Sequence, residues 1–157
     1  MKQEKGLVTL MEVSEVELIY KSKIKASKRP VITSAEDAHR LFKKYWNKNS
    51  IELVEEFYAM FLNRSNRVLG IYHLSTGGIT GTVADPRLVF MTALKLSAVY
   101  IIIAHNHPSS NLKPSRADTE LTVKINEGAK FLDIKLLDHL IINEGFCYYS
   151  FAEEGVL

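Results

Sequence analysis

The sequence predicts a single α/β domain in which helices flank one mixed β-sheet. The chain has 157 residues, 46% of them apolar, which is enough for one hydrophobic core and too little for a second full domain. Strand and helix patterns are interleaved along it. Residues 99–104 are an apolar run with many β-branched side chains, typical of a central strand covered on both faces.

The first 50 residues differ in character and predict an N-terminal extension, a strand plus a helix, that packs on a domain formed by residues 51–157. Residues 13–25 alternate loosely between apolar and polar side chains, as a strand does. Ser34 and Asp37 then have the spacing of a helix cap, and apolar residues recur at helical spacing. These are Ala38, Leu41, Phe42, Tyr45 and Trp46. His39 falls beside them, and we expect it to be a partly exposed packing residue.

The middle of the chain predicts an antiparallel hairpin followed by a helix. Residues 57–63 and 68–74 have the composition of strands, and a polar turn separates them. A glycine-containing connection, residues 75–82, comes next. Asp85 and Pro86 then begin a helix, because proline is tolerated in a first turn, where its missing amide proton would be unpaired anyway.

The last third predicts one more helix and a terminal hairpin. Ser115 and Asp118 have the Ser-x-x-Asp spacing of a capping pair, so we expect a helix from there to about residue 130. Residues 134–142 and 146–150 then form a hairpin around a polar turn. Capping is a purely structural interpretation of the Ser-x-x-Asp pair, and it is compatible with a chemical role for both residues.

Composition limits the classes of partner. Twenty basic and 18 acidic residues give a formal charge of +2, so the field of the whole molecule neither attracts nor repels nucleic acid strongly. The apolar run at residues 98–104 is far short of the ~20 residues that a membrane span needs. Cys147 is the only cysteine, and we expect a buried strand thiol in a cytoplasmic protein.

Two histidines directly follow the predicted central strand. His105 and His107 are two residues apart, so in an extended chain both imidazoles lie on one face and can contact one metal ion. The loop through Pro114 leaves room for Asp118 to return toward the same ion. Two imidazoles and a carboxylate suit zinc, and three protein ligands with a fourth position for water are typical of catalytic zinc. Such an ion lowers the pKa of its water to roughly 7.

A hydrolase of this type also needs a carboxylate that carries a proton from the water to the leaving group. Glu52, Glu55 and Glu56 stand before the first strand of the hairpin. Periodicity does not separate Glu55 from Glu56, because a shift of one residue moves a side chain to the opposite face of the sheet. His73 and His139 receive no role from their local patterns.

Three other metal-dependent interpretations fit the sequence poorly, two because of spacing and one because the required residues are missing. The nuclease family named for His-Asn-His spreads those residues over a much longer ββα unit. A metallo-β-lactamase needs an Asp-His pair just after the second histidine, where this chain has Pro108. A zinc deaminase needs a Pro-Cys-x-x-Cys segment, which the single Cys147 cannot supply.

The segment from His105 to Asp118 resembles the JAMM (MPN-plus, or JAB) metalloprotease motif. In that motif His-x-His is followed by seven residues, a serine, two residues and an aspartate, and the match here has no insertion or deletion. Similarity to the RadC-like branch of the family extends over roughly residues 50–157. It includes the segment from Ala104 to Pro108 and residues 137–142.

The resemblance implies a cytidine-deaminase-like α/β sandwich and a zinc-dependent hydrolase of peptide or isopeptide bonds, with a protein or peptide as substrate. It implies one zinc ion per chain, with Ser115 helping to stabilise the tetrahedral intermediate. The implied ligands are His105, His107 and Asp118. The family's glutamate stands two residues before the phenylalanine of the first strand, which corresponds to Glu55, and Glu56 is the alternative.

The chain departs from the RadC-like pattern at two places. Ser110 stands where relatives usually have glycine after His-Pro-Ser, which affects the turn but no ligand. Full-length RadC-like proteins also carry an N-terminal helical segment resembling a helix-hairpin-helix DNA-binding module. Residues 1–50 are too short and differently patterned to supply it.

An alternative function is a nucleic-acid-associated accessory protein, in DNA repair or mobile-element biology, with a non-catalytic metal site. It depends on five basic residues within nine positions, which could follow phosphates if residues 21–25 are extended. They are Lys21, Lys23, Lys25, Lys28 and Arg29. Alternating lysines on the edge of a sheet also serve to prevent edge-to-edge aggregation, which is a structural explanation for the same pattern.

Overall fold

Five strands and three α-helices make up the part of the chain that the structure describes, residues 14–77, 84–145 and 147–157 of a computed structural model. The strands are β1 (Glu56–Leu62), β2 (Val68–Thr76), β3 (Tyr100–Asn106), β4 (Lys135–Ile142) and β5 (Tyr148–Ser150). The helices are α1 (Ala35–Tyr45), α2 (Pro86–Lys95) and α3 (Arg116–Phe131), and a short 3₁₀ helix, η1 (Ala26–Lys28), precedes them.

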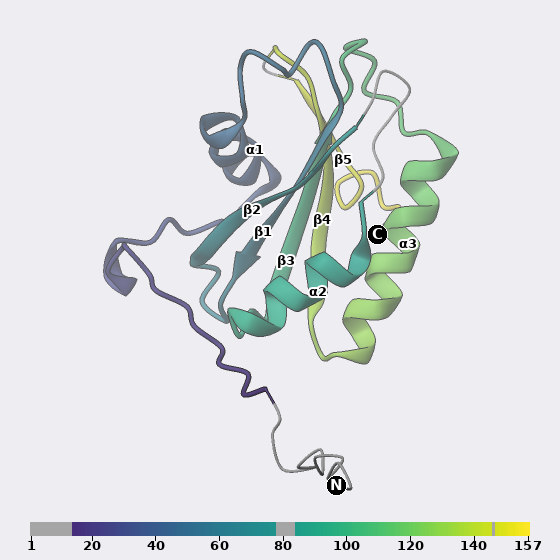
Figure 1. Ribbon diagram of the computed structural model, residues 1–157. Helices are drawn as coiled ribbons and strands as arrows, with labels where there is room; N and C mark the ends of the chain where they lie inside the picture. The colour runs from purple at the N-terminus through teal and green to yellow at the C-terminus, as the bar shows by residue number, and fades with distance from the viewer. Residues whose placement is uncertain (1–13, 78–83, 146) are drawn as a thin grey trace, which may run out of the picture.

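The strands form one mixed sheet in the order β2-β1-β3-β4-β5. β1 pairs antiparallel with β2 and with β3, β3 pairs parallel with β4, and β4 pairs antiparallel with β5. Helix α1 covers one face of the sheet, and α2 and α3 cover the other (Figure 1). This arrangement confirms the predicted α/β class and the mixed sheet with flanking helices.

The central strands bury side chains on both faces, as the apolar run at residues 99–104 predicts. Ile101 and Ile103 pack in the cluster that includes α2 and α3, whereas Ile102 and Ala104 pack in the cluster that includes α1. Alternation continues to the end of the strand. His105 therefore faces the α3 side of the sheet.

The predicted helix caps are present. The Ser34 side chain accepts a hydrogen bond from the Asp37 amide at the start of α1. Asp85 caps α2 through the Arg87 amide, and Pro86 occupies the first turn, as expected. Helix α1 packs on the sheet through the cluster that includes Phe42 and Trp46. The division of the chain near residue 50 stays a prediction.

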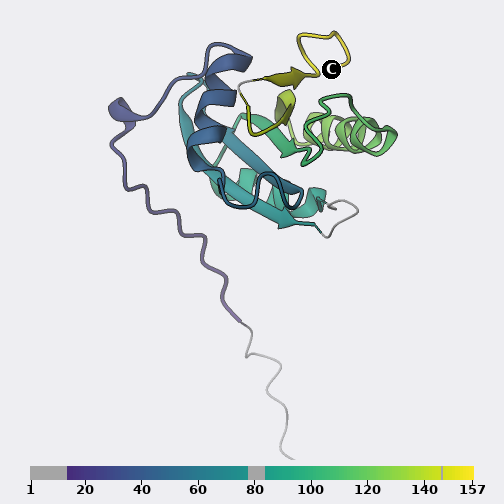
Figure 2. The ribbon, with the colours of Figure 1, turned by 90° about the horizontal axis from the view of Figure 1, so that it is seen from above.

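The predicted strand over residues 13–25 is wrong for the part that the structure describes. Residues 14–25 form no strand and run away from the sheet as an exposed arm (Figures 1 and 2). The Tyr20 hydroxyl donates to the Leu69 carbonyl, 2.6 Å away. Alternation alone does not make a strand, because a strand also needs a neighbour for its backbone groups. The lysines of this arm therefore do not share the face of a strand.

Two other expectations need correction. His39 is buried, with 3% of its surface exposed, because its ring packs on Tyr148 with centroids 4.8 Å apart. Cys147 is exposed, because β5 begins only at Tyr148.

Phe146 and residues 78–82 of the predicted connection lie outside the described residues. In the described part of the chain, no helix is long and apolar enough to cross a membrane.

The burial of His39 predicts a loss of stability in acid. Burial lowers the pKa of His39 to about 4, whereas an imidazole in the unfolded chain titrates near 6.5. As the pH falls from 6.5 toward 4, protons bind mainly to the unfolded state, so the free energy of unfolding decreases. We expect His39→Phe, which keeps a ring against Tyr148, to remove about 2 kcal/mol of this decrease at pH 4.5. Urea unfolding of both proteins at pH 7.5 and 4.5 measures it, and equal losses in both would contradict the assignment.

Candidate metal centre

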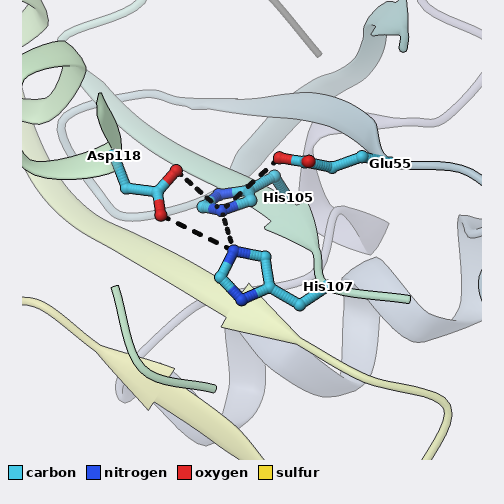
Figure 3. Close-up of side chains that lie close together, drawn as sticks. All are labelled: Glu55, His105, His107 and Asp118. Carbon is cyan, nitrogen blue, oxygen red and sulfur yellow. Dashed lines mark hydrogen bonds and ion pairs between the residues drawn. The ribbon is translucent and has the colours of Figure 1, made fainter. Parts of the chain in front are cut away.

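Four side chains from three separate segments converge at the carboxyl end of β3 (Figure 3). Glu55 precedes β1, His105 lies in β3, His107 follows it and Asp118 lies in the first turn of α3. Each offers one possible ligand atom, and these atoms all lie within 4.8 Å of one another. The structure therefore brings together the two histidines, the aspartate and the glutamate that the sequence suggested.

The distances among the histidines and the aspartate fit one tetrahedral metal ion. His105 Nε2 lies 3.0 Å from His107 Nε2 and 3.1 Å from Asp118 Oδ1, and His107 Nε2 lies 3.5 Å from Asp118 Oδ2. Ligand atoms about 2.0–2.1 Å from a tetrahedral zinc ion are about 3.3 Å apart. Glu55 Oε1 is farther away, 3.9 Å from His105 Nε2. These distances favour a site with three ligands, and the Glu55 carboxylate lies just outside it.

The start of α3 positions Asp118 through a capping box. Ser115 Oγ accepts a hydrogen bond from the Asp118 amide at 3.1 Å, and Asp118 Oδ2 accepts one from the Ser115 amide at 2.7 Å. The predicted capping pair is therefore confirmed. The same carboxylate directs Oδ1 to His105, so capping and ligand geometry coexist in one side chain.

Hydrogen bonds fix the proton of His107. Its Nδ1 lies 2.5 Å from the Asn111 carbonyl oxygen, which can only accept, so Nδ1 carries the proton. In the neutral ring Nε2 then presents a lone pair to the centre, which is the form that a metal requires. Burial opposes ionisation of Asp118, but in the metal-free centre the contacts with the His105 and His107 imidazoles outweigh it and hold the pKa of this carboxyl well below its usual range. The centre therefore places a carboxylate beside two imidazole nitrogens, and the same carboxylate raises the pKa of His107.

Strand register separates the two candidate glutamates. Phe57 pairs with His105 across β1 and β3, and its ring stacks on the His105 ring. Glu55 lies two residues earlier and is directed to the same side as Phe57. Glu56 points to the opposite side, where Oε2 accepts a hydrogen bond from Ser50 and Oε1 lies 3.6 Å from His73. Glu52 is exposed and is not one of the four converging residues.

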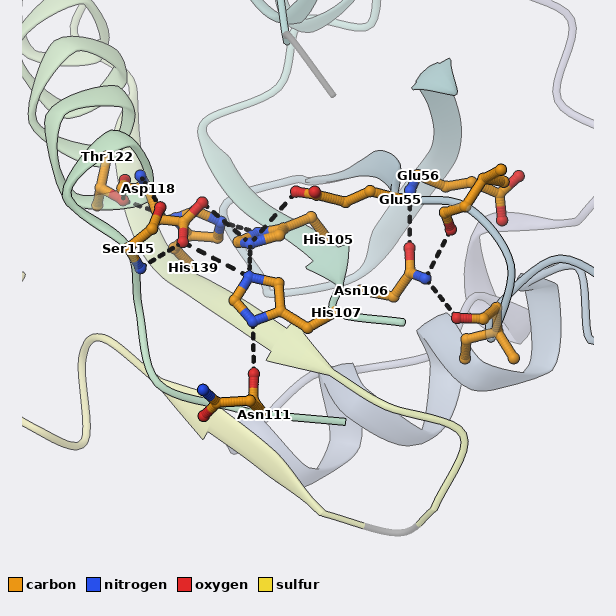
Figure 4. Close-up of polar contacts among 12 residues, drawn as sticks. Glu55, Glu56, His105, Asn106, His107, Asn111, Ser115, Asp118, Thr122 and His139 are labelled. Carbon is orange, nitrogen blue, oxygen red and sulfur yellow. Dashed lines mark hydrogen bonds and ion pairs between the residues drawn. The ribbon is translucent and has the colours of Figure 1, made fainter. Parts of the chain in front are cut away.

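Asn106 holds the segment that carries Glu55, and the local sequence pattern gave no sign of this. Its Oδ1 accepts a hydrogen bond from the Glu56 amide at 2.7 Å (Figure 4). Its Nδ2 donates to the carbonyls of Ile51 and Val54, at 2.6 and 2.9 Å. All three partners are backbone groups some fifty residues away in the chain. The buried amide therefore fixes the backbone on both sides of Glu55.

His139 lies directly behind His105 and is the second residue that sequence analysis left without a role. Its Nε2 is 2.8 Å from His105 Nδ1. A register shift in the β3–β4 pairing sets Leu136 opposite Ile101 and Asp138 opposite Ile102, so one extra residue of β4 stands between them. This bulge reverses the alternation of β4 and turns His139 toward the α3 side. Burial lowers the pKa of His139 well below its usual value, so the ring is neutral.

The turn after the histidines accommodates the departure at Ser110. This residue has a φ of 62°, a left-handed conformation that glycine adopts more readily than serine. Its hydroxyl donates to Glu144 Oε2 at 2.7 Å. The hydrogen bond to the β4–β5 connection offsets part of the cost of the conformation, so the turn keeps its shape without glycine.

The comparison with known proteins agrees with the fold. A family model described as a RadC-like JAB domain matches residues 32–156. The chain belongs to the RadC-like JAB domain family. The match to the RadC-like family begins just before α1.

Relatives of this RadC-like domain carry the name UPF0758 protein. One from Flavobacterium johnsoniae is 52% identical over 102 residues, covering 65% of this chain and 44% of the relative. Another, from Fusobacterium nucleatum, is 36% identical over 146 residues, covering 93% of this chain and 59% of the relative. A third, from Clostridium acetobutylicum, is 31% identical and covers the whole chain and 76% of the relative. The chain spans less than half the length of the relative from Flavobacterium johnsoniae, and the same holds for relatives from Porphyromonas gingivalis and Symbiobacterium thermophilum.

The three hydrogen bonds of Asn106 predict a large loss of stability when its side-chain amide is replaced by a carboxylate. In Asn106→Asp the carboxylate can still accept from the Glu56 amide, but it faces two carbonyl oxygens with no proton to donate. We expect the free energy of unfolding to fall by about 2–4 kcal/mol. Asn49→Asp, on the surface, is the matched control and should change it by less than about 0.5 kcal/mol. Equal small effects in urea unfolding would show that the Asn106 amide does not hold this segment.

Proposed function

We propose that this RadC-like JAB domain is a zinc-dependent hydrolase of peptide or isopeptide bonds. The observation that carries the proposal is the convergence of His105, His107 and Asp118 at ligand distances with the Glu55 carboxylate beside them. A purely structural metal site has no need of a fourth side chain, and an acidic one, held just outside ligand distance. Three ligands with one position left for water is the arrangement typical of catalytic zinc.

Zinc is the metal that suits these donors. Two imidazole nitrogens and one carboxylate are borderline ligands, and their separations agree with a small tetrahedral ion. A bound zinc ion supplies a Lewis acid and makes water a strong nucleophile at neutral pH. Proton transfer and hydrogen bonding to the substrate are carried out by side chains of the protein.

In the proposed reaction Glu55 transfers a proton. Water adds to the carbonyl carbon of the substrate, and the Glu55 carboxylate accepts the proton that the water loses. The carbon–nitrogen bond then breaks, and Glu55 gives the same proton to the departing amine. The products are a carboxylic acid and an amine, so one water molecule is consumed and no other reactant is required.

Ser115 is the proposed donor to the oxygen of the substrate carbonyl. Its Oγ accepts from the Asp118 amide and therefore keeps its own proton for another partner. It sits at the start of α3, where the partial positive charge of the helix also favours a developing negative charge. The helix start thus holds a metal ligand and a donor to the reacting oxygen three residues apart.

The proposed substrate is a protein or peptide in the cytoplasm. An amide bond, in a main chain or at a lysine side chain, is the group that these residues can hydrolyse. The alternative of a nucleic-acid partner has less support, because the basic residues 21–29 lie on an exposed arm and in η1, with no strand to align them.

The metal can be tested directly. We expect purified protein incubated with zinc at neutral pH to retain about one zinc ion per chain after desalting, measured by mass spectrometry of the metal. A His105→Ala/His107→Ala double variant should retain none, because two of three ligands are missing. Wild-type protein that stays free of zinc would overturn the proposal.

The role of Glu55 is tested by a pair of matched variants. Glu55→Gln should keep the zinc and lower turnover of fluorogenic peptide and ubiquitin-like isopeptide substrates by at least about 100-fold, because glutamine cannot accept the proton. Glu56→Gln should leave both nearly unchanged, since Glu56 faces the other side of the sheet. Loss of zinc from Glu55→Gln would instead make Glu55 a ligand, and equal turnover in both variants would exclude it as the base.

A further inference from the structure

A chain of buried hydrogen bonds runs behind His105 and returns to the helix that carries Asp118 (Figure 4). His105 Nδ1 is 2.8 Å from His139 Nε2, and His139 Nδ1 is 2.6 Å from Thr122 Oγ1. Thr122 Oγ1 is in turn 2.6 Å from the backbone oxygen of Asp118, one helical turn earlier in α3. His105 and His139 are fully buried and Thr122 is 2% exposed.

The number of available protons gives this chain of hydrogen bonds one donor-to-acceptor direction. Thr122 has a single hydroxyl proton, and the Asp118 carbonyl oxygen 2.6 Å away has none, so the hydroxyl donates to the carbonyl. Thr122 can then only accept from His139, which places the His139 proton on Nδ1. His139 is fully buried, and in the part of the chain that the structure describes its ring nitrogens contact only Thr122 and His105, so the ring carries one N–H. His139 Nε2 is therefore an acceptor, and His105 must donate to it from Nδ1. The reverse direction would leave two oxygens 2.6 Å apart with no proton between them.

We propose that Thr122 and His139 are positioning residues that hold the proton of His105 on Nδ1 and so keep its Nε2 lone pair directed at the metal. The inference rests on the proposed zinc centre and names the residues that prepare one of its ligands. The Asp118 backbone oxygen sets the direction of the chain at one end, and the Asp118 carboxylate lies beside the ligand atom at the other.

The surrounding residues hold the His139 ring in the orientation that this chain of hydrogen bonds requires. Phe151 stacks on it with centroids 4.7 Å apart and rings within 9° of parallel, and Phe57 lies 5.6 Å away on a tilted plane. The Asp138 carboxylate accepts hydrogen bonds from the His139 and Ala152 amides, which fixes the backbone. A ring enclosed in this way cannot turn over without displacing its neighbours.

A neutral acceptor behind the ligand also has an electrostatic consequence. Metal-bound histidines commonly donate to a carboxylate, a carbonyl or water. Here the acceptor is an uncharged imidazole, so Asp118 is the one anionic ligand among the three. With one carboxylate and two neutral imidazoles as ligands, this set would leave a bound zinc ion with a net positive charge, which would favour polarisation of a substrate carbonyl.

The test removes one hydroxyl. Thr122→Val has nearly the same shape but offers His139 Nδ1 no acceptor, so we expect zinc affinity, measured by competition with a chromophoric chelator, to fall by about 10–100-fold. Thr122→Ser restores the hydroxyl and should restore affinity to within about threefold of wild type. Thr92→Val is the matched control, because Thr92 makes the same bond to the carbonyl four residues earlier, in α2, away from the metal. Equal affinities for Thr122→Val and Thr92→Val would overturn the proposal.

A spectroscopic measurement on the zinc-loaded wild type needs no variant. Long-range ¹H–¹⁵N correlation of the imidazoles should show His139 protonated at Nδ1 and unprotonated at Nε2, and a His139 proton on Nε2 would overturn the proposal. Zinc binding with the expected tautomer but without hydrolysis would remove the proposed function and leave the positioning role. Hydrolysis that is unaffected by Thr122→Val, with unchanged zinc affinity, would do the reverse.

Discussion

The placement of β3 between β1 and β4 is the constraint on which the metal centre depends. β3 contributes His105 and Asn106 on opposite faces at its last two positions. Antiparallel pairing with β1 brings Phe57, and with it the segment of Glu55, beside His105. Parallel pairing with β4 brings His139 behind the same ring. One strand therefore connects the ligand, the carboxylate and the buried imidazole, which come from distant parts of the chain.

The two final residues of β3 have complementary tasks. His105 faces α3 and contacts the ligand set, whereas Asn106 faces the α1 side and binds three backbone groups around Glu55. A backbone held by side-chain hydrogen bonds in a buried site has few alternative conformations, because each alternative leaves a polar group unpaired. The position of Glu55 relative to the metal ligands thus depends on an amide that takes no part in the proposed chemistry.

The beginning of α3 combines roles that are usually considered separately. Asp118 closes a capping box with Ser115, lies beside the His105 ligand atom and, through its backbone oxygen, accepts a hydrogen bond from the Thr122 hydroxyl. Helix formation and the preparation of the metal centre therefore depend on the same few hydrogen bonds. The capping pair and the metal ligand are two functions of one local geometry.

The sequence by itself determined what depends on near neighbours in the chain. Residues two apart in a strand share a face, and residues three apart can close a helix cap, so His105 with His107 and Ser115 with Asp118 followed from spacing. Strand register, by contrast, is a long-range property. Only the tertiary structure decided that Glu55 rather than Glu56 faces the centre, and that a bulge in β4 turns His139 toward it. The strand predicted before α1 failed for the same reason, because alternation along residues 14–25 does not provide the neighbouring strand that pairing requires.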